Sequence, residues 1–362
     1  MTTRIHNFNA GPAALPLDVL QQAQAELLNF NNTGMSILEI SHRSKPYEQV
    51  NAEAEANLKE LLGLGENYRV LFLQGGASLQ FAMVPLNFLP QGQTADYILS
   101  GSWSEKALKE AQLIGQTHVA ATTAGENYRR VPGLAEIKPS ASPAYIHLTS
   151  NNTIFGTQWA EFPSFGDIPL IADMSSDILC KPFDASKFAL IYAGAQKNLG
   201  PAGVTIVIIR QDLLENSPGA IPTMLRYSTH AKNDSLYNTP PTFGVYMIHL
   251  VLRWIKAQGG LAGIEKQNRA KAGLIYDAID QSGGYYRGHA EPDSRSLMNI
   301  TFRLPNEELE QTFVAQAAQA GLGGLKGHRS VGGLRASVYN AVTRKSCQAL
   351  RDFMLGFQQN NS

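Results

Sequence analysis

The sequence predicts an α/β protein with a large domain built on a mostly parallel, seven-stranded sheet and a smaller α+β domain at the C-terminal end. Short apolar runs alternate with longer helical patterns over the first two thirds of the chain. Near-continuous apolar strands separated by helices are typical of a parallel sheet that is covered on both faces. With 362 residues, 44% of them hydrophobic, the chain is long enough for a large core and for two domains.

The large domain is expected to begin with a helix at Leu17–Phe30, next to Pro16, and a second at Pro46–Leu62, before Gly63. Helical patterns also follow the first two strands, at Leu79–Leu89 and Glu105–Ile114. Seven apolar runs are predicted strands: Arg69–Leu73, Ala95–Leu99, His118–Thr122, Tyr145–Thr149, Leu170–Asp173, Phe188–Tyr192 and Val204–Ile209.

A long apolar helical pattern at Thr242–Gln258 ends at Gly259-Gly260, where we place the domain boundary. The remainder predicts three helices and two strands: helices at Leu261–Gln281, Asn306–Ala320 and Arg344–Phe357, and strands at Leu297–Phe302 and Arg335–Val338. The expected organisation is therefore an N-terminal arm at residues 1–15, a large domain at 16–258 and a small domain at 259–362.

The charge balance argues against a broad nucleic-acid-binding surface, because 30 basic and 30 acidic residues give zero net charge. Cys180 and Cys347 lie far apart in the sequence, which does not suit a disulfide framework and is typical of a reducing compartment. No apolar stretch approaches the roughly 20 residues of a bilayer span. The first residues also lack the apolar segment of a secretory signal. We therefore expect a cytoplasmic protein with no membrane or nucleic-acid partner.

Lys197 is the main candidate for chemistry. It follows Ala193-Gly194-Ala195-Gln196 and lies between the last two predicted strands of the sheet. Burial lowers the pKa of an ammonium group, and a neutral lysine is a nucleophile that forms a Schiff base with carbonyl compounds. Taken alone, Lys197 better fits an exposed lysine before the Gly200-Pro201 turn, which is the commoner environment of lysine, and it is the neighbouring features that favour the chemical role.

Three further features lie near the ends of predicted strands, where ligands bind in such sheets. Asp173 is either a cap or turn residue or the carboxylate that keeps the ring nitrogen of pyridoxal phosphate protonated. The turn Gln74-Gly75-Gly76-Ala77-Ser78 suits a phosphate monoester and matches neither of the common nucleotide-binding glycine motifs. Trp103 either stacks on a planar ring or packs beneath its loop.

Two histidine–arginine pairs, His42-Arg43 and His328-Arg329, occur in distant parts of the chain, and Arg335 follows the second pair. Arginine binds carboxylate and phosphate groups through a bidentate fork, so these residues suit a small substrate with two anionic groups. The alternative for each is a surface salt bridge. Glycines at Gly327 and Gly332-Gly333 favour a ligand-binding loop for the second pair.

Together these residues resemble the fold-type I pyridoxal phosphate enzymes, and within them the phosphoserine aminotransferase family of class V. The similarity extends over nearly the whole chain. It includes Phe8-Asn9-Ala10-Gly11-Pro12-Ala13, Ser41-His42-Arg43, Ala172-Asp173-Met174-Ser175-Ser176, Tyr192-Ala193-Gly194-Ala195-Gln196-Lys197-Asn198, Asn238-Thr239-Pro240-Pro241 and Gly332-Gly333-Leu334-Arg335. The Lys197 and Asn238 segments are highly specific as a pair.

The resemblance implies pyridoxal phosphate as the cofactor, with no metal. Lys197 is implied to be the Schiff-base lysine, Asp173 to meet the ring nitrogen, and Trp103 to stack on the ring. Further cofactor contacts are implied for Ala77, Ser78, Thr153 and Gln196. A homodimer is also implied, in which the cofactor phosphate of the neighbouring subunit is reached by Asn238 and Thr239. Some family members have Gly-Arg where this chain has Ala77-Ser78, so the charge of that arginine is absent here.

The resemblance also implies the substrates. Arg335 would hold the α-carboxylate, and the substrate phosphate or distal carboxylate would be held by His42, Arg43, His328 and Arg329. The implied reaction is reversible amino transfer from L-glutamate to 3-phosphohydroxypyruvate, which gives O-phospho-L-serine and 2-oxoglutarate in serine biosynthesis. The family is linked to pyridoxine biosynthesis as well, through 4-phosphohydroxy-L-threonine.

Two kinds of alternative remain. The first is another fold-type I enzyme, such as an alanine–glyoxylate aminotransferase or a cysteine desulfurase. The desulfurase needs a reactive cysteine in a mobile loop, and neither Cys180, after apolar residues, nor Cys347, in a predicted helix, suits that role. The second is a non-catalytic binding protein on the same scaffold, which would be expected to lack Lys197 or Asp173, whereas both are present.

Overall fold

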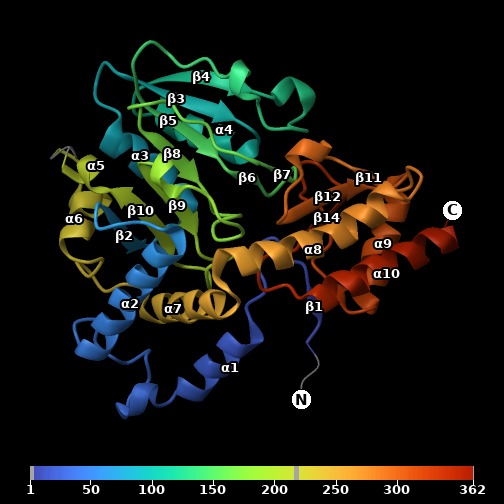
Figure 1. Ribbon diagram of the computed structural model, residues 1–362, viewed down its shortest axis with the longest axis horizontal. Coiled ribbons are helices and arrows are strands. Elements are labelled where there is room, and N and C mark those ends of the chain that lie inside the picture. Colours follow the sequence, from blue (N-terminus) through green and yellow to red (C-terminus); the bar gives the residue numbers. More distant parts are fainter. Residues whose placement is uncertain (1–3, 216–219, 362) are drawn as a thin grey trace.

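The computed structural model describes residues 4–215 and 220–361. Residues 1–3 of the expected arm, residues 216–219 of the expected large domain and residue 362 of the expected small domain lie outside the described residues. Figure 1 shows a larger part around the central sheet and a smaller C-terminal part, with helix α8 (Gly260–Asp280) running from one to the other. In the described residues, no helix combines the length and the apolar character that crossing a membrane requires.

A seven-stranded sheet forms the centre of the larger part, which confirms the predicted fold class. The strand order is β2-β10-β9-β8-β5-β3-β4, and only β10 pairs antiparallel with its neighbours. The strands span β2 Tyr68–Leu73, β3 Thr94–Leu99, β4 Gln116–Thr122, β5 Pro143–Thr149, β8 Leu170–Asp173, β9 Leu190–Gly194 and β10 Thr205–Arg210.

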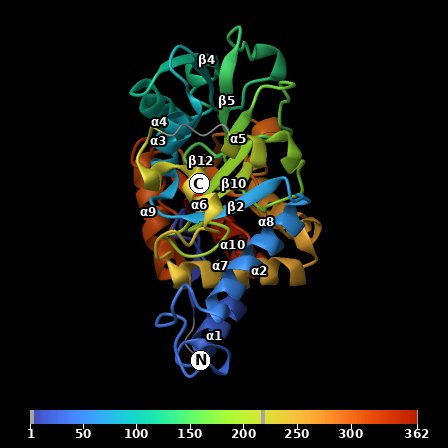
Figure 2. The ribbon, with the colours of Figure 1, turned by 90° about the vertical axis from the view of Figure 1, so that its left-hand side faces the viewer.

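Helices cover both faces of this sheet, because successive strand residues point to opposite sides. In β2, Val70 and Phe72 pack in one hydrophobic cluster and Leu71 and Leu73 in another. The first cluster includes α2 (Lys45–Leu62) and α7 (Thr242–Ala257), and the second includes α3 (Gly76–Phe88) and α4 (Ser102–Gln112). Helix α1 (Leu17–Glu26) lies at the end of the molecule beyond α2 and α7 (Figures 1 and 2).

The smaller part is an α+β unit. Strands β11 (Arg287–Gly288), β12 (Asn299–Arg303) and β14 (Leu334–Ser337) form an antiparallel sheet, which packs with helices α8, α9 (Glu307–Gln319) and α10 (Arg344–Asn361) in one hydrophobic cluster. The N-terminal β1 (His6–Asn7) pairs parallel with β13 (Leu322–Gly323), so the start of the chain is bound to this part.

Several element boundaries differ by a few residues from those predicted, among them the end of α1 and the bounds of β9. The helix predicted to continue to Phe30 ends at Glu26 and is followed by a 3₁₀ turn at Phe30–Asn32. The strand predicted from Phe188 begins at Leu190, because the Phe188 N–H closes a 3₁₀ turn by donating to the Ala185 carbonyl. Strand β9 also ends later than predicted, at Gly194, three residues before Lys197.

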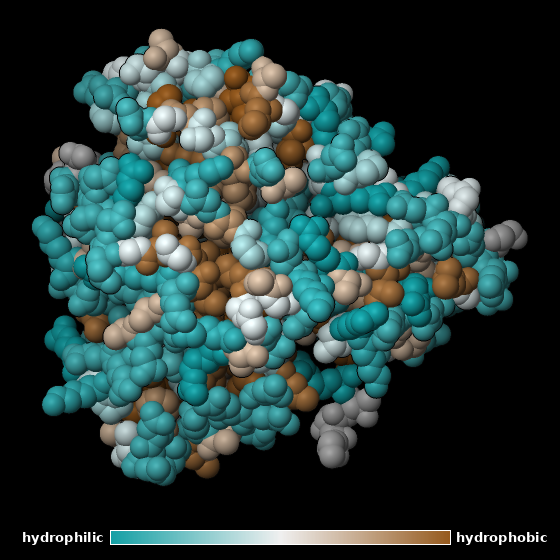
Figure 3. Space-filling model, viewed as in Figure 1, coloured by the Kyte–Doolittle hydropathy of each residue, from teal (hydrophilic) through white to brown (hydrophobic). Residues whose placement is uncertain are grey.

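The remaining elements are short. They are β6 Asn151–Asn152, β7 Thr157–Gln158, α5 Gln211–Glu215, α6 Tyr227–Lys232 and 3₁₀ turns at Ala124–Glu126, Leu134–Glu136, Ala185–Lys187, Thr223–Leu225 and Pro292–Ser294. The face of the molecule in Figure 3 is mostly hydrophilic, with hydrophobic residues gathered in a few separate patches.

Candidate active site

A cavity of about 320 Å³ lies between the seven-stranded sheet and the smaller C-terminal part. Nine residues named by the sequence analysis line it: Ala77, Ser78, Trp103, Thr153, Asp173, Gln196, Lys197, His328 and Arg335. The volume is within the usual range of small-molecule sites, roughly 300–1,000 Å³. These residues come from elements that are distant in the sequence, so it is the fold that brings them together.

The parallel register of the sheet explains this convergence. Thr149 at the end of β5 pairs with Asp173 at the end of β8, and Asp173 pairs with Tyr192 of β9. Three carboxyl ends therefore meet at one edge of the sheet. Polar residues following these strands are directed toward the same space, the crevice in which α/β sheets bind their ligands.

Lys197 lies just after β9, and its Nζ donates a hydrogen bond to Oγ1 of Thr153 over 2.7 Å. The side chain borders the cavity, while protein atoms surround its ammonium group. This burial lowers the pKa of Lys197 to about 8, against the opposing effect of the Asp173 carboxylate and with a smaller contribution from the Arg335 charge. A substantial fraction of this lysine is therefore a neutral amine near neutral pH.

Asp173 is a buried carboxylate at the end of β8, with 4% of its surface exposed. Its Oδ1 accepts the Ser175 N–H at 2.9 Å. Burial raises the pKa of Asp173, and the hydrogen bonds from Ser175 and the charge of Lys197 act in the opposite direction. A further cation beside Asp173 would favour the charged carboxylate, so this position suits a protonated ring nitrogen.

Helix α3 begins at the cavity, and its first three residues, Gly76, Ala77 and Ser78, line it. The N–H groups of a first helical turn have no acceptor within the helix, so this turn suits a phosphate group. Gly75 precedes the helix with φ 89°, and a Cβ at this position would lie 2.5 Å from Cδ2 of Leu79. Glycine at this position thus allows the left-handed backbone conformation and leaves room for the Leu79 side chain of the same helix.

Trp103 lies in the first turn of α4 and lines the cavity. Gly101 precedes α4, and any larger residue at this position would collide with Asn152, because a Cβ would lie 1.6 Å from its Nδ2. The glycine therefore allows the start of α4, and with it Trp103, to lie next to Asn152. The Lys197 Nζ is 6.0 Å from the centroid of the Trp103 ring. The Trp103 Nε1 is buried and has no hydrogen-bond partner among the described residues.

Arg335 lies in β14 of the smaller C-terminal part and lines the cavity from there. Its Nη1 donates to the Thr153 carbonyl at 3.1 Å, and its Nε is buried without a hydrogen-bond partner among the described residues. Burial lowers the pKa of Arg335. A buried guanidinium with an unpaired N–H is suited to an anionic ligand, because an unsatisfied charged donor costs free energy in a folded protein.

Five residues named by the sequence analysis do not line this cavity: His42, Arg43, Asn238, Thr239 and Arg329. Arg329 adjoins His328, and its charge lowers the pKa of that histidine. The Thr239 carbonyl accepts a hydrogen bond from Nε2 of Gln74 at 3.4 Å, just before α3. The Nε2 of His42 is buried and has no partner among the residues that the structure describes.

The cavity also contains residues that the sequence analysis did not assign to the site, among them Gly11, Thr149, Asn151, Ile154 and Ser176. The sequence contains a pattern that could have identified some of these residues. The run Thr149-Ser150-Asn151-Asn152-Thr153 places five polar residues directly after a buried strand. All five are buried, and such a polar run marks a strand end that faces a ligand or a second domain.

Comparison with known proteins identifies the family. A model of the aminotransferase class-V family matches residues 5–350. The phosphoserine aminotransferase of Lysinibacillus sphaericus is 62% identical over 99% of both chains, and that of Bacillus subtilis is 56% identical over 99% of both. The chain belongs to the class-V aminotransferase family. Among these relatives it falls with the phosphoserine aminotransferases.

Solved structures of class-V aminotransferases agree with this result. The phosphoserine aminotransferase of Bacillus circulans subsp. alkalophilus has a TM-score of 0.99 and 61% identity, with 100% of both chains covered. The pyridoxal phosphate-bound phosphoserine aminotransferase of Trichomonas vaginalis has a TM-score of 0.92 and 39% identity, over 97% of this chain and 100% of that one. An alanine–glyoxylate aminotransferase from Nostoc shares only the fold, at 16% identity.

Pyridoxal phosphate is the cofactor of this class-V aminotransferase, and the cavity fits it. The α3 N-terminus suits the phosphate, Asp173 suits the ring nitrogen, and Lys197 supplies an amine of lowered pKa. The buried Thr149 Oγ1 has no hydrogen-bond partner among the described residues, as expected where a polar ligand completes the site.

Proposed function

We propose that the protein catalyses the reversible transfer of the amino group of L-glutamate to 3-phosphohydroxypyruvate, giving O-phospho-L-serine and 2-oxoglutarate. The observation that carries this proposal is the pairing of Lys197 and Asp173 in one cavity with Arg335. An amine nucleophile, a buried carboxylate and a partly unpaired guanidinium are the groups that amino transfer between two carboxylic acids requires. High identity to phosphoserine aminotransferases along the whole chain supports the choice of substrates.

Pyridoxal phosphate supplies an aldehyde that bonds to amines and a ring that takes up electrons from the substrate Cα. The N–H groups of Gly76, Ala77 and Ser78 would bind its phosphate, and Trp103 would cover its ring. Asp173 would hold the proton on the ring nitrogen, because a buried carboxylate next to a cation favours the charged state of both. Gln196 and Thr153 would bind the remaining polar atoms.

Lys197 would move the proton at the substrate Cα. As a free amine, its Nζ would be a base whose pKa of about 8 lies within about one unit of neutral pH, as general acid–base catalysis requires. Thr153 lies next to the Nζ and would keep it oriented. Because the carbonyl of the same Thr153 accepts from Arg335, the group that binds the α-carboxylate is tied to the position of the base.

We further propose a homodimer in which Asn238 and Thr239 complete the cofactor site of the neighbouring subunit. Within one chain these residues lie outside the cavity, as do His42 and Arg43. Large apolar side chains are exposed between α1 and α2, including Leu28 at 85% and Leu38 at 59%, and a subunit interface would cover such side chains. Both cysteines are buried free thiols, which supports action in the reducing cytoplasm.

The test is a set of half-reactions on the purified, cofactor-loaded protein. L-Glutamate and O-phospho-L-serine should each convert the visible absorbance of the lysine-bound cofactor to that of its amine form, and 3-phosphohydroxypyruvate should restore it. L-Alanine with glyoxylate should be at least about 100-fold less efficient, since the alanine side chain leaves the distal cationic groups unpaired. Preference for alanine and glyoxylate would contradict the proposal. 4-Phosphohydroxy-L-threonine, tested in the same way, decides the link to pyridoxine synthesis.

A further inference from the structure

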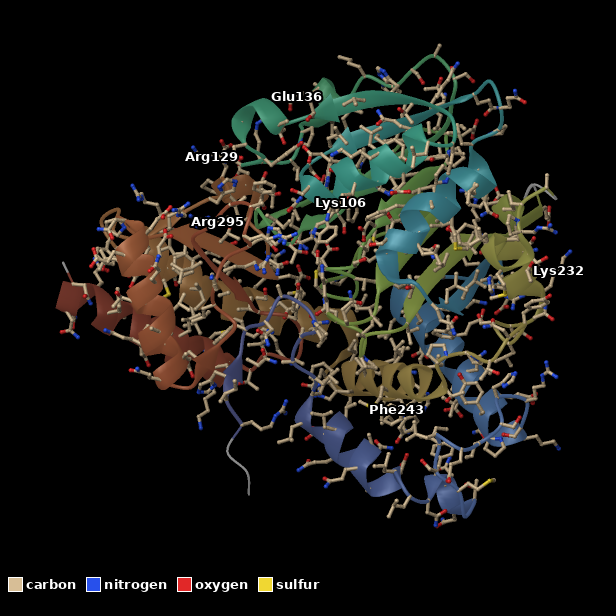
Figure 4. All side chains as sticks on the ribbon, turned by 180° about the vertical axis from the view of Figure 1, so that it is seen from behind. Lys106, Arg129, Glu136, Lys232, Phe243 and Arg295 are labelled. Carbon is tan, nitrogen blue, oxygen red and sulfur yellow. The ribbon has the colours of Figure 1, made fainter. Side chains whose placement is uncertain are left out.

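Lys106 of helix α4 is a cation at the rim of the cavity that the site described above does not include. Its Nζ lies over the Trp103 ring, 4.3 Å from the ring centroid. Lys106 does not itself line the cavity, but Trp103 does. Figure 4 labels Lys106 on the side of α4 that is turned toward the small domain. A cation over an indole ring is attracted by the negative face of the ring, which fixes a side chain that would otherwise move freely.

The ammonium group of Lys106 makes no ion pair with a carboxylate in the described part of the chain, unlike many other lysines and arginines here. Its charge acts instead on His328, across the boundary between the domains. Burial is the main cause that lowers the pKa of His328, and the charges of Arg335, Arg329 and Lys106 lower it further. His328 and Arg335 thus line the cavity, and the charges of Lys106 and Arg329, which do not line it, act on His328 as well.

The hydrogen bonds of His328 leave one ring nitrogen for a ligand. Its Nδ1 lies 2.7 Å from Oγ of Ser330 and accepts the Ser330 N–H at 3.2 Å. Because Nδ1 accepts the Ser330 N–H, the neutral imidazole ring carries its proton on Nε2. Cations gathered in this way repel one another, and an anion bound between them relieves the repulsion. The relief is greater for a phosphate of charge close to −2 than for a carboxylate of charge −1.

We propose that Lys106 is a specificity-determining residue, whose ammonium group, held over Trp103, makes the site favour a substrate with a distal phosphate over one with a distal carboxylate. The inference rests on the proposed function, because the distal groups are those of O-phospho-L-serine and L-glutamate. Lys106 has no role in the chemical step. Its effect is on the binding of the distal group and on the charge of His328.

The first test compares Lys106→Gln, which keeps most of the stem and removes the charge, with Lys109→Gln, a lysine on the same helix that does not line the cavity. Spectral titration of the loaded protein gives the dissociation constants. Lys106→Gln should weaken binding of O-phospho-L-serine about tenfold and of L-glutamate at most about threefold, since the missing charge acts more strongly on the dianion. L-Alanine and the Lys109→Gln variant should show no change, and Lys106→Arg should restore the preference. Equal losses for both acidic substrates, or none, would overturn the inference.

The second test needs no turnover. Calorimetry of inorganic phosphate and acetate with the loaded protein should show weaker phosphate binding in Lys106→Gln and unchanged acetate binding. NMR titration should show a higher pKa of His328 in this variant than in the wild type or in Lys109→Gln, because one repelling charge is gone. An unchanged His328 pKa together with unchanged phosphate binding would overturn the role of Lys106. If the proposed function is wrong but Lys106 acts as inferred, the protein will not turn over O-phospho-L-serine. The changes in phosphate binding and in the pKa of His328 will still be seen in Lys106→Gln.

Discussion

Thr153 connects Lys197, which follows strand β9 of the seven-stranded sheet, to Arg335 of strand β14 in the smaller C-terminal part. Its hydroxyl accepts the Lys197 Nζ at 2.7 Å, and its carbonyl accepts the Arg335 Nη1 at 3.1 Å. The proposed base and the proposed carboxylate-binding group therefore contact the side chain and the main chain of one residue. Of these two contacts, the one with Arg335 crosses between the larger and the smaller part, so a shift between the parts would disturb it and, through Thr153, would affect the orientation of the lysine.

Replacement of Lys197 should abolish amino transfer. Lys197→Ala removes the amine that is proposed to bond the cofactor and to move the Cα proton, so turnover should fall by about 10³-fold or more. The variant should still bind pyridoxal phosphate through α3 and Asp173, but without the visible absorbance of the lysine-bound form. Retained turnover with that absorbance would show that another residue is the nucleophile. Lys271→Ala, at a buried lysine that bonds three main-chain carbonyls outside the cavity, is the matched control, and it should keep the absorbance if it folds.

The rate at which the cofactor-free protein takes up pyridoxal phosphate should depend on pH with a midpoint of about 8. Only the neutral amine attacks the aldehyde. Because burial lowers the pKa of Lys197 from 10.5 to about 8, the neutral fraction rises through this range. At pH 7.5 roughly a quarter of such an amine is neutral, against about a thousandth for an unshifted lysine. Stopped-flow absorbance measures the rate, and a midpoint above pH 10 would contradict the lowered pKa.

The same shift has a consequence for stability. A lysine with a lower pKa in the folded than in the unfolded protein binds fewer protons when folded, so the unfolded state binds more between pH 8 and 10.5. The contribution of Lys197 to the free energy of unfolding should therefore increase with pH across this window. Lys197→Met should remove that increase in the cofactor-free protein, and chemical denaturation at several pH values measures it. An unaltered pH dependence in the variant would be inconsistent with a buried, titrating Lys197.

We expect the charge of Asp173 to affect the rate of the reaction through the cofactor ring and not through the stability of the fold. Asp173→Asn removes the negative charge that would hold the ring proton, so the rate of the glutamate half-reaction should fall by about 10²-fold or more. The matched control is Asp96→Asn, because Asp96 is also a buried strand carboxylate, but it bonds Ser140 and does not line the cavity. A control that lost the half-reaction rate as strongly as Asp173→Asn, while remaining folded, would argue against a specific role.

Subunit mixing should reveal residues that act across a dimer. Lys197→Ala and Arg43→Ala should each be poorly active as homodimers. If Arg43 acts in the neighbouring subunit, a mixed dimer contains one site with both residues intact, and complete exchange should restore about a quarter of wild-type activity. Mixed dimers can be isolated with two affinity tags. No recovery in isolated mixed dimers would place Arg43 in the site of its own chain, or outside any site.

Gly101 should be essential for the position of Trp103. A Cβ on this residue would overlap Nδ2 of Asn152, at 1.6 Å, so Gly101→Ala should destabilise the protein by about 1–3 kcal/mol and weaken cofactor binding. Gly125→Ala is the control, since no atom lies within 4 Å of the Cβ it would gain. Thermal unfolding and cofactor titration measure the two effects. Equal melting temperatures for the two variants would show that the Asn152 contact relaxes without cost.

The sequence by itself determined the elements and much of the chemistry. Apolar periodicity and the glycines that end helices are local signals, so strands such as Leu170–Asp173 and helices such as Thr242–Ala257 lie where they were predicted or within a few residues of it. Asp173 and Lys197 were recognisable because a charged residue at the end of a buried strand needs a partner. The class-V family followed from motifs spread along the chain.

Only the tertiary structure decided which of these residues meet. An apolar run does not record strand direction, so the antiparallel course of β10 could not be predicted from its residues. The link from Lys197 through Thr153 to Arg335, and the position of Lys106 over Trp103 near His328, join segments far apart in the sequence. Such contacts depend on domain packing, whose free energy is shared among many residues and leaves no pattern around any single one.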